Sequence, residues 1–416
     1  MTPESTLTPL LGAQRWFGSK ARTLAGGRVV DSEELAPGCV LALFRADFAE
    51  GGDELYQLPM RLNDDGAPEL SLADPVLAHG LLAALRSGQP IASLEGSLEF
   101  ALTGPLPEAS ALVPVRAVGG EQSNSSVVFG GQVILKVYRR LQDGESTELE
   151  LLRFLAGQGF EHTPRLLGWY SYAGASITAT LGVLQAFVPD ARDGWELALE
   201  SFGDPAPFLP HLRRLGEVTA RMHSALAGDA DDPAFRPEPL GSGAAESSEA
   251  EARDALEALE PGGGAEPVRA RTADVLERLR SLHRAGTGGQ AIRQHGDYHL
   301  GQVLWAGGDW LVLDFEGEPA RPLAERRRKS SPLRDVAGML RSFAYAAETV
   351  RSRGDAPAGD WERDARAAFL AGYDAKIDQA LLPSAGVARA SLLAACELEK
   401  ALYELRYELN NRPDWV

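Results

Sequence analysis

The sequence contains little cysteine and has a deficit of basic charge. Its 416 residues include two cysteines, Cys39 and Cys396, which lie far apart and form no paired or metal-ligand spacing. This pattern excludes a disulfide-framed secreted domain and predicts two reduced, buried thiols in a cytoplasmic protein. Acidic residues outnumber basic ones by 59 to 41, which gives a formal net charge of -18. Nucleic-acid binding through a basic surface is therefore not expected.

Long apolar runs are also missing. No uninterrupted apolar stretch reaches the roughly 18 residues that a membrane-spanning helix needs. The first residues, MTPES, lack the basic and apolar regions of a signal peptide. Hydrophobic residues nevertheless make up 44% of the chain, enough for two or three domains with separate cores. We expect a globular cytoplasmic protein that contacts no membrane.

Three blocks of different periodicity divide the chain. Residues 1–88 predict a small sheet with one helix, and residues 89–190 predict a β-rich block with one helix at 148–157. Residues 191–416 show mainly helical periodicity. The helices expected there span 212–226, 268–283, 332–349, 360–381 and 388–409, with a short one possible at 246–259. This order indicates an α+β protein.

Two acids and a carboxamide stand at spacings that phosphoryl transfer requires. Residues 294–304 read QHGDYHLGQVL, and residues 312–316 read VLDFE. Asp297 and Gln302 lie five positions apart, as do the Asp and Asn of a kinase catalytic loop, and Asp314 occupies the place of the metal-binding Asp. We therefore predict Asp297 as the base that accepts the proton of the attacking hydroxyl. Gln302 and Asp314 are predicted to hold Mg²⁺.

A predicted β-hairpin explains how these groups meet. Residues 303–305 and 310–313 have strand character, and Gly307-Gly308-Asp309 between them predicts a tight turn. The returning strand would carry Asp314 back beside Gln302.

A lysine within an apolar strand marks the nucleotide side. Lys136 lies in VILKVY, residues 133–138, and is predicted to bind the α- and β-phosphates of ATP. It needs a carboxylate partner on the following helix, for which we select Glu150, with Glu148 as the alternative. Further nucleotide contacts are expected from a small polar loop and from the hinge before the helical block. These residues are Ser123, Asn124, Ser125, Gln185 and Phe187.

Acceptor recognition is assigned to the helical block. The predicted helix from residue 388 carries carboxylates and aromatics at three- and four-residue steps, which suits sugar hydroxyls and a sugar plane. A solvated charge stripe over a leucine core face is an equally open interpretation. The acceptor residues predicted on or near this site are His299, Glu316, Lys400, Tyr403, Glu404 and Trp415. For His299 and Trp415 a packing role is the alternative.

Together these motifs resemble the aminoglycoside-phosphotransferase-like kinases, and within them the actinobacterial maltokinases. The matching stretches include QSNSS at 122–126, HGDYHLGQV at 295–303, DFEGEP at 314–319 and SPLRDVAGML at 331–340. RWFGSK at 15–20 is similar to the start of the family's N-terminal cap.

The resemblance implies a bilobal protein-kinase-like fold with a cap subdomain, a β-rich N-lobe and an α-helical C-lobe. It also implies transfer of the γ-phosphate of ATP, with Mg²⁺, to the anomeric hydroxyl of maltose. Glucosamine or another monosaccharide is the alternative acceptor. A non-catalytic binding protein fits less well, because Lys136, Asp297, Gln302 and Asp314 are all present. An aminoglycoside kinase fits less well, because Gln302 and DFEGEP at 314–319 resemble the maltokinase-like branch instead. We expect a monomer or weak dimer.

Overall fold

The chain folds into two compact units in the computed structural model. The structure describes residues 4–20, 22–64, 66–70, 72–119, 124–229, 231–259, 264–319, 321–354 and 360–411. The first unit comprises Met1–Ala156 and Pro164–Asp190, and the second comprises Gly157–Thr163 and Ala191–Val416.

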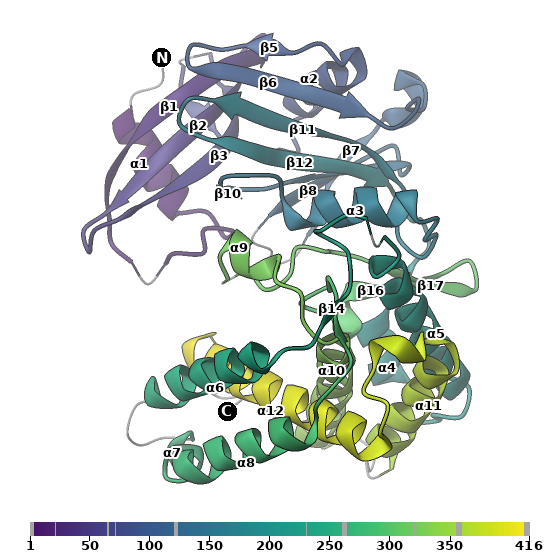
Figure 1. Ribbon diagram of the computed structural model, residues 1–416. Coiled ribbons are helices and arrows are strands. Elements are labelled where there is room, and N and C mark those ends of the chain that lie inside the picture. The colour runs from purple at the N-terminus through teal and green to yellow at the C-terminus, as the bar shows by residue number, and fades with distance from the viewer. Residues whose placement is uncertain are drawn as a thin grey trace. The chain divides into compact units, whose positions relative to one another are not determined.

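The first sheet of the first unit has the order β1-β2-β3-β10, with β4 added beside β3. All its pairings are antiparallel. A long hairpin of β1 and β2 forms most of it, and apolar side chains of β2 and β3 pack against helix α1 (Figure 1). The elements are α1 (Glu4–Gly12), β1 (Leu24–Ala36), β2 (Cys39–Phe48), β3 (Asp53–Leu62), β4 (Pro68–Glu69) and β10 (Arg140–Leu141).

The second sheet of this unit is seven-stranded, in the order β5-β6-β11-β12-β9-β8-β7. A tight turn joins β8 to β9, and it is formed by Gly130 and Gly131, which both have positive φ. The strands are β5 (Ile91–Ala92), β6 (Gly96–Leu102), β7 (Val115–Ala117), β8 (Ser125–Phe129), β9 (Val133–Val137), β11 (Leu166–Gly174) and β12 (Thr178–Ala186). Its helices are α2 (Pro75–Ser87), η1 (Ala109–Leu112) and α3 (Thr147–Gly157).

A buried glutamine joins the two sheets. Gln57 of β3 donates from Nε2 to the carbonyl oxygens of Tyr138, at 2.8 Å, and Leu181, at 2.7 Å. Its Oε1 accepts the Tyr170 hydroxyl at 2.7 Å, and its backbone N–H donates to the Arg139 carbonyl at 2.8 Å. Every polar atom of this fully buried side chain is therefore satisfied, as a buried amide requires.

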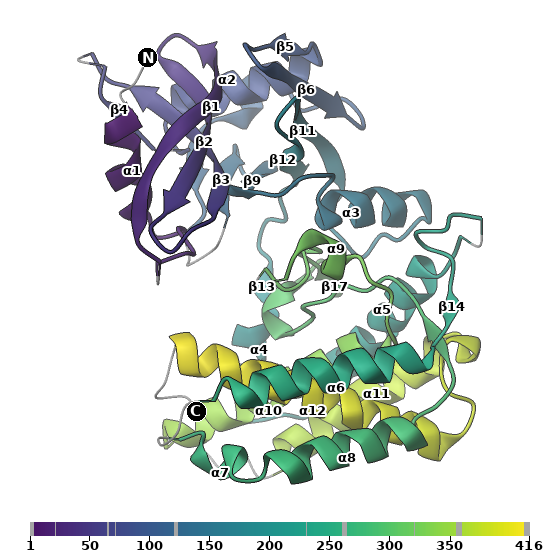
Figure 2. The same ribbon diagram turned by 60° about the vertical axis from the view of Figure 1, so that its left-hand side comes forward.

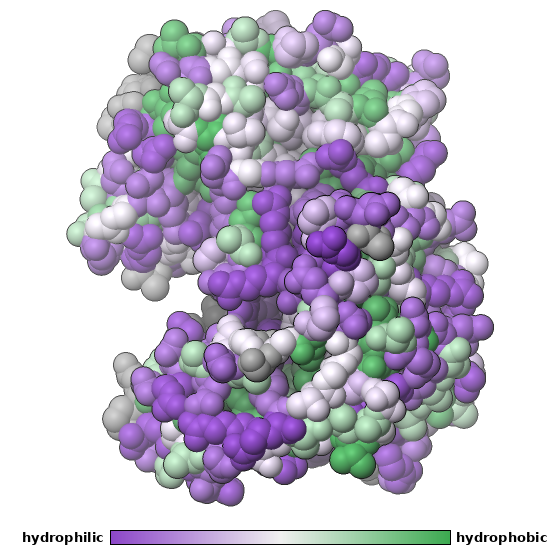
Figure 3. Space-filling model, viewed as in Figure 1, coloured by the Kyte–Doolittle hydropathy of each residue, from purple (hydrophilic) through white to green (hydrophobic). Residues whose placement is uncertain are grey.

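The second unit is mainly helical. Its helices are α4 (Gly194–Glu200), α5 (Leu209–Leu226), α6 (Ser242–Glu257), α7 (Glu266–Arg269), α8 (Thr272–Ala285), α9 (Leu323–Arg326), α10 (Leu333–Ser352), α11 (Trp361–Lys376) and α12 (Gly386–Asn411), with short turns η2 (Leu300–Gln302) and η3 (Gln379–Leu381). Figures 1 and 2 show α6 and α8 lying along α12, where leucines from all three form one core cluster. Hydrophilic residues cover the outer faces of α6 and α8 (Figure 3).

Glycines let two helices of this unit cross closely. A Cβ on Gly216 of α5 would lie 2.0 Å from the Phe369 carbonyl oxygen, and one on Gly372 of α11 would lie 1.9 Å from the Arg213 carbonyl oxygen. Only glycine fits at such a backbone-to-backbone contact.

Two small sheets complete the unit. Strands β13 (Arg192–Asp193), β16 (Val303–Ala306) and β17 (Asp309–Val312) form one, and β14 (Glu238–Pro239) pairs with β15 (Gln290–Ala291). The predicted hairpin after the catalytic-loop motif is thereby confirmed, with Val303 opposite Val312. Among the described helices, none combines the length and apolar character needed to cross a membrane.

Candidate active site

A buried carboxylate organises the loop that contains Asp297. Asp335, in the first turn of α10, accepts the backbone N–H groups of His295 at 2.9 Å and Gly296 at 3.0 Å. His223 lies 3.1 Å from the same carboxylate and 2.9 Å from the Tyr373 hydroxyl. Burial raises the pKa of Asp335, but the hydrogen bond from His223 and its charge outweigh this, so the net shift is downward. Asp335 therefore stays ionised and holds the loop backbone in place.

The His295 ring connects this loop to the strand end before Asp314. Its Nε2 lies 2.7 Å from the Leu313 carbonyl oxygen, and its Nδ1 lies 3.3 Å from the backbone nitrogen of Asp297. A carbonyl only accepts and a backbone amide only donates, so Nε2 carries the hydrogen and Nδ1 the lone pair. Both ring nitrogens of His295 are therefore hydrogen-bonded to backbone atoms of the loop and the strand end.

Gln302 and Asp314 lie side by side, as the hairpin predicted. Gln302 Nε2 donates to Asp314 Oδ2 at 3.2 Å, and the backbone N–H of Leu313 donates to the Gln302 carbonyl at 2.9 Å. Asp314 has a φ of 60°, in the left-handed region that Asp tolerates better than most residues. Carboxylate oxygens of Asp314 and Glu316 lie within 4.8 Å of each other. This oxygen donor set fits a hard divalent cation such as Mg²⁺.

A lysine of α12 contacts the candidate base. Lys400 Nζ lies 3.1 Å from Asp297 Oδ1 and 3.0 Å from Glu318 Oε1, and it sits 4.6 Å from the centre of the Tyr403 ring. Burial lowers the pKa of Lys400, but the charges of Asp297 and Glu318 outweigh it and the net shift is upward. Burial and the charge of Glu318 raise the pKa of Tyr403 to about 12. The lysine is therefore an ammonium ion bridging two carboxylates.

His299 lies beside the same carboxylate. Its Nε2 is 4.0 Å from Asp297 Oδ2, and its Nδ1 accepts the Gly301 backbone N–H at 3.1 Å. Burial lowers the pKa of His299, although the charge of Asp297 opposes this. A neutral imidazole with Nε2–H facing the base is consistent with both observations.

Glu404 is held in an ion pair between two helices. Arg341 of α10 donates from Nε at 2.9 Å and from a terminal nitrogen at 2.7 Å, both to Glu404 Oε2. Burial raises the pKa of Glu404, and the charge of Arg341 partly offsets this. The carboxylate expected to receive a sugar hydroxyl therefore already has a cationic partner.

The partner of Lys136 differs from the one selected from the sequence. Lys136 Nζ lies 2.8 Å from Glu148 Oε2, which also accepts the Tyr138 hydroxyl at 2.7 Å. The preference for Glu150 was therefore wrong and the alternative is correct. Glu148 lies on the buried face of α3, in helical phase with Leu151, Leu152 and Leu155, whereas Glu150 points about 200° further around the helix.

The other predicted nucleotide residues lie along the same sheet. Ser125 Oγ accepts Arg139 Nε at 2.8 Å, and Gln185 Nε2 donates to the Pro164 carbonyl at 3.1 Å. The backbone N–H of Phe187 donates to the Gln132 carbonyl at 2.8 Å. Asn124 is the first described residue after the polar loop. Ser123 of that loop and Trp415 near the C-terminus lie outside the described residues.

Several residues that hold the site were not predicted from the sequence. Asp335, His223 and Glu318 were not predicted as site residues. The sequence shows Asp335 as an acid in the first turn of a predicted apolar helix. It does not show that this acid contacts the backbone of the loop at His295. Glu318 belongs to the quoted DFEGEP stretch, but only its contact with Lys400 shows what it does.

Comparisons with known proteins agree with this geometry. Residues 114–393 match the model of the phosphotransferase enzyme family, and residues 11–91 match that of the maltokinase N-terminal cap domain. A glucosamine kinase of Streptacidiphilus jiangxiensis is 31% identical over 72% of this chain and 70% of its own length. A glucosamine kinase of Mycolicibacterium smegmatis is 31% identical over 72% of this chain and 76% of its own.

Solved structures extend the likeness to the whole chain. A glucosamine kinase (crystal form B) has a TM-score of 0.73 at 25% identity, covering 98% of this chain and 96% of its own. Another, in complex with glucosamine, ADP and inorganic phosphate, has a TM-score of 0.70 at 25% identity and covers 100% and 97%. The predicted kinase-like fold with an N-terminal cap is therefore confirmed.

Proposed function

The chain belongs to the phosphotransferase enzyme family and is a sugar kinase, and we propose that its acceptor is maltose. In this proposal the enzyme phosphorylates the anomeric hydroxyl of maltose with ATP. The hydroxyl oxygen forms a bond to the γ-phosphorus while the bond to the β,γ-bridging oxygen breaks. The products are maltose 1-phosphate and ADP. The match to the maltokinase cap over residues 11–91 supports this acceptor.

Asp297 is proposed to accept the proton of the attacking hydroxyl. Its loop is held by Asp335 through two backbone N–H groups, and its carboxylate is held by Lys400 at 3.1 Å. Such a positioned base contributes about 10²–10⁴ in rate. His299 and Tyr403, beside the same carboxylate, are proposed to contact the acceptor sugar.

Gln302 and Asp314 are proposed to bind Mg²⁺ through oxygen, with Glu316 close by. The ion would neutralise charge on the phosphates and orient them for in-line transfer. Lys136, fixed by Glu148, is proposed to bind the α- and β-phosphates. Asn124, Ser125, Gln185 and Phe187 remain proposed nucleotide contacts.

The observation that supports a neutral acceptor is the ammonium of Lys400 between Asp297 and Glu318. Lys400 offsets one of these two carboxylate charges, so the ammonium of an amino sugar bound there would meet one remaining negative charge rather than two and would be repelled by Lys400 itself. Two like charges about 4 Å apart repel by about 4 kcal/mol at an effective dielectric constant of about 20. Glu404, the next carboxylate on this helix face, is already paired with Arg341. Maltose, which carries no charge, avoids this repulsion.

Glucosamine is the second candidate acceptor. It is favoured by the names of the two curated relatives and of the most similar solved structures reported above. The two candidates differ in charge and in the hydroxyl that would be phosphorylated.

A direct acceptor comparison tests the proposal. We would measure ADP release with Mg²⁺-ATP and maltose, glucose or glucosamine, and locate the new phosphate by phosphorus NMR. We expect the highest kcat/KM for maltose, with phosphate on the anomeric oxygen. A far higher kcat/KM for glucosamine, with phosphate on O6, would replace this proposal with the second candidate. The Asp297→Asn variant is the control for enzyme-dependent transfer and should lose about 10²–10⁴ in kcat while remaining folded.

A further inference from the structure

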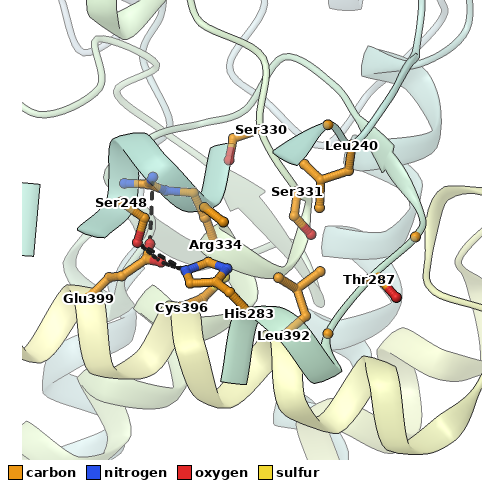
Figure 4. A pocket seen from close by; sticks show the side chains of 14 residues that line it. Leu240, Ser248, His283, Thr287, Ser330, Ser331, Arg334, Leu392, Cys396 and Glu399 are labelled. Atoms are coloured by element: carbon orange, nitrogen blue, oxygen red, sulfur yellow. Dashed lines mark hydrogen bonds and ion pairs between the residues drawn. The ribbon is translucent and has the colours of Figure 1, made fainter. Parts of the chain in front are cut away.

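A cavity of about 170 Å³ lies within the helical unit, where α6, α8, α10 and α12 meet. Figure 4 shows Ser248, His283, Arg334 and Glu399 gathered at one end, with Leu240 and Leu392 on other walls. None of the described residues that line it belongs to the candidate active site. At about 30 Å³ per water, the space would hold about six water molecules or a small organic molecule.

The carboxylate of this cavity is already occupied. Glu399 Oε1 lies 2.8 Å from His283 Nε2 and also accepts the Ser248 hydroxyl. Burial raises the pKa of Glu399, but the His283 hydrogen bond and the Arg334 charge outweigh this effect, so the net shift of the pKa is downward. Glu399 is therefore ionised, and its Oε1 already accepts hydrogen bonds from two partners.

Arg334 retains hydrogen-bonding capacity. Its contact with Glu399 Oε2 spans 3.7 Å, which is too long for a hydrogen bond, and no other side-chain bond of Arg334 is formed within the described part of the chain. A guanidinium carries five N–H donors in a planar fork that matches a carboxylate or phosphate. The side chain is 34% exposed, so a ligand can reach it from the cavity.

Backbone donors add to this positive character. Helix α6 begins at the cavity with Gly241 as its N-cap, which offers no side-chain cap to the first N–H groups. Helix α10 begins beside it, after Ser330 and Ser331, but its first N–H group, that of Leu333, already donates to Ser331 Oγ at 3.2 Å. The end of α6 is therefore the helix terminus that favours a negative ligand here.

We propose that this cavity binds a small organic anion, whose carboxylate or phosphate head pairs with Arg334. Its carbon body lies against Leu240 and Leu392, and the hydroxyls of Ser330, Ser331 and Thr287 are within the same lining.

The cavity is coupled to the candidate catalytic loop. Ser330 exchanges backbone hydrogen bonds with Ile292, at 3.0 and 2.9 Å, and the Ser331 carbonyl accepts the Gln294 side chain. Arg334 directly precedes Asp335, which holds the His295 and Gly296 amides. A bound anion would therefore stabilise the start of α10 and, through it, the loop that carries Asp297.

A matched ligand series tests the charge. Butyrate, butanol and butylammonium share one carbon body and differ in the head group. Isothermal titration of the full-length protein should show butyrate binding at about 1 mM, the range expected for so small a ligand, and no heat for the other two. Stronger binding of butylammonium would mean that Glu399 dominates, and absence of butyrate binding would equally overturn the proposal.

Variants locate the binding. Arg334→Gln should weaken butyrate binding about tenfold to a hundredfold, as expected on losing a charged hydrogen-bond donor. Arg366→Gln is the matched control, because Arg366 also pairs with a glutamate of α12, Glu397, but does not line the cavity. Equal weakening in both variants, or none in Arg334→Gln, would refute the site.

Hydrogen exchange gives a readout that does not depend on stability of the variant. In the wild type, butyrate should slow exchange of the amides at Ile292, Ser330 and Gly296. If butyrate slowed amide exchange only near Lys136, the anion would bind at the nucleotide site, and the proposal of a binding site in the cavity would be wrong.

Discussion

Replacing Lys400 by Met tests the most informative contact of the site. The change removes the cation between Asp297 and Glu318 while keeping an unbranched side chain of similar length. At 3.1 Å two opposite unit charges attract by about 5 kcal/mol at an effective dielectric constant of about 20. Breaking a buried ion pair from one side costs about 3–5 kcal/mol. Because Lys400 and Asp297 are 17% and 25% exposed, we expect the lower end, about 3 kcal/mol of unfolding free energy.

The same variant should change acceptor preference. The repulsion between Lys400 and an amino sugar is about 4 kcal/mol at an effective dielectric constant of about 20, and about 2 kcal/mol at a dielectric constant of about 40 nearer to solvent. Removing it should raise the ratio of kcat/KM for glucosamine over maltose by about thirtyfold. Turnover with maltose should fall because Asp297 loses its partner.

The assay is ADP release with each acceptor, alongside chemical denaturation of the same preparations. Lys400→Arg keeps the charge and should keep the ratio. Arg366→Met removes another cation paired with α12 and should lower stability without moving the ratio. A change of less than about threefold in the acceptor ratio of Lys400→Met would refute the electrostatic reasoning.

Three further predictions concern the supports of the site. Asp314→Ala should raise the Mg²⁺ concentration needed for half-maximal activity and nearly abolish turnover, as a magnesium titration would measure; an unchanged metal requirement would remove Asp314 from that role. Because the pKa of Asp335 is lowered by folding, its contribution to stability is present above its unfolded value of about 3.9 and is lost as pH falls through the folded value. The melting temperatures of wild type and Asp335→Asn should therefore differ at pH 7 and converge below about pH 4, and a constant difference would contradict this. Glu148→Gln should raise the KM for ATP, whereas Glu150→Gln should leave it nearly unchanged. Equal effects of the two variants would show that the KM for ATP does not depend on the ion pair of Lys136 with Glu148.

Local patterns predicted much of the fold. The hairpin at β16 and β17, the helix α12 and the strands β8 and β9 follow from short-range periodicity and turn glycines. Strand β1 escaped prediction because most of its residues are only partly buried and its register with β2 shifts at three points, which breaks the alternation of apolar residues. Gly27 also lowers the predicted strand propensity of this segment. The structure shows why glycine is needed there, because a Cβ would lie 2.4 Å from the Phe44 ring.

In the candidate site, contacts between residues close in the sequence were predicted, and contacts between distant residues were not. Asp297, Gln302 and Asp314 lie within 18 positions of one another, so a single loop and hairpin bring them together. The contact of Lys400 with Asp297 joins residues 103 positions apart, and that of Asp335 with His295 joins residues 40 positions apart. One sequence carries no signal for such pairs. The choice between Glu148 and Glu150 depended on the phase of α3, which the position of its first turn decides.

The glutamine that joins the two sheets of the first unit bears on how this protein can be cut or recombined. Without β3 and Gln57, the carbonyls of Tyr138 and Leu181 would both lose the side-chain amide that bonds them, although Leu181 would keep the Tyr138 N–H, and β10 would lose its pairing partner. The N-terminal segment is thus an integral part of the body that carries Lys136. Truncated versions starting near residue 89, or chimeras that exchange this segment between relatives, would need to replace that amide and strand edge together.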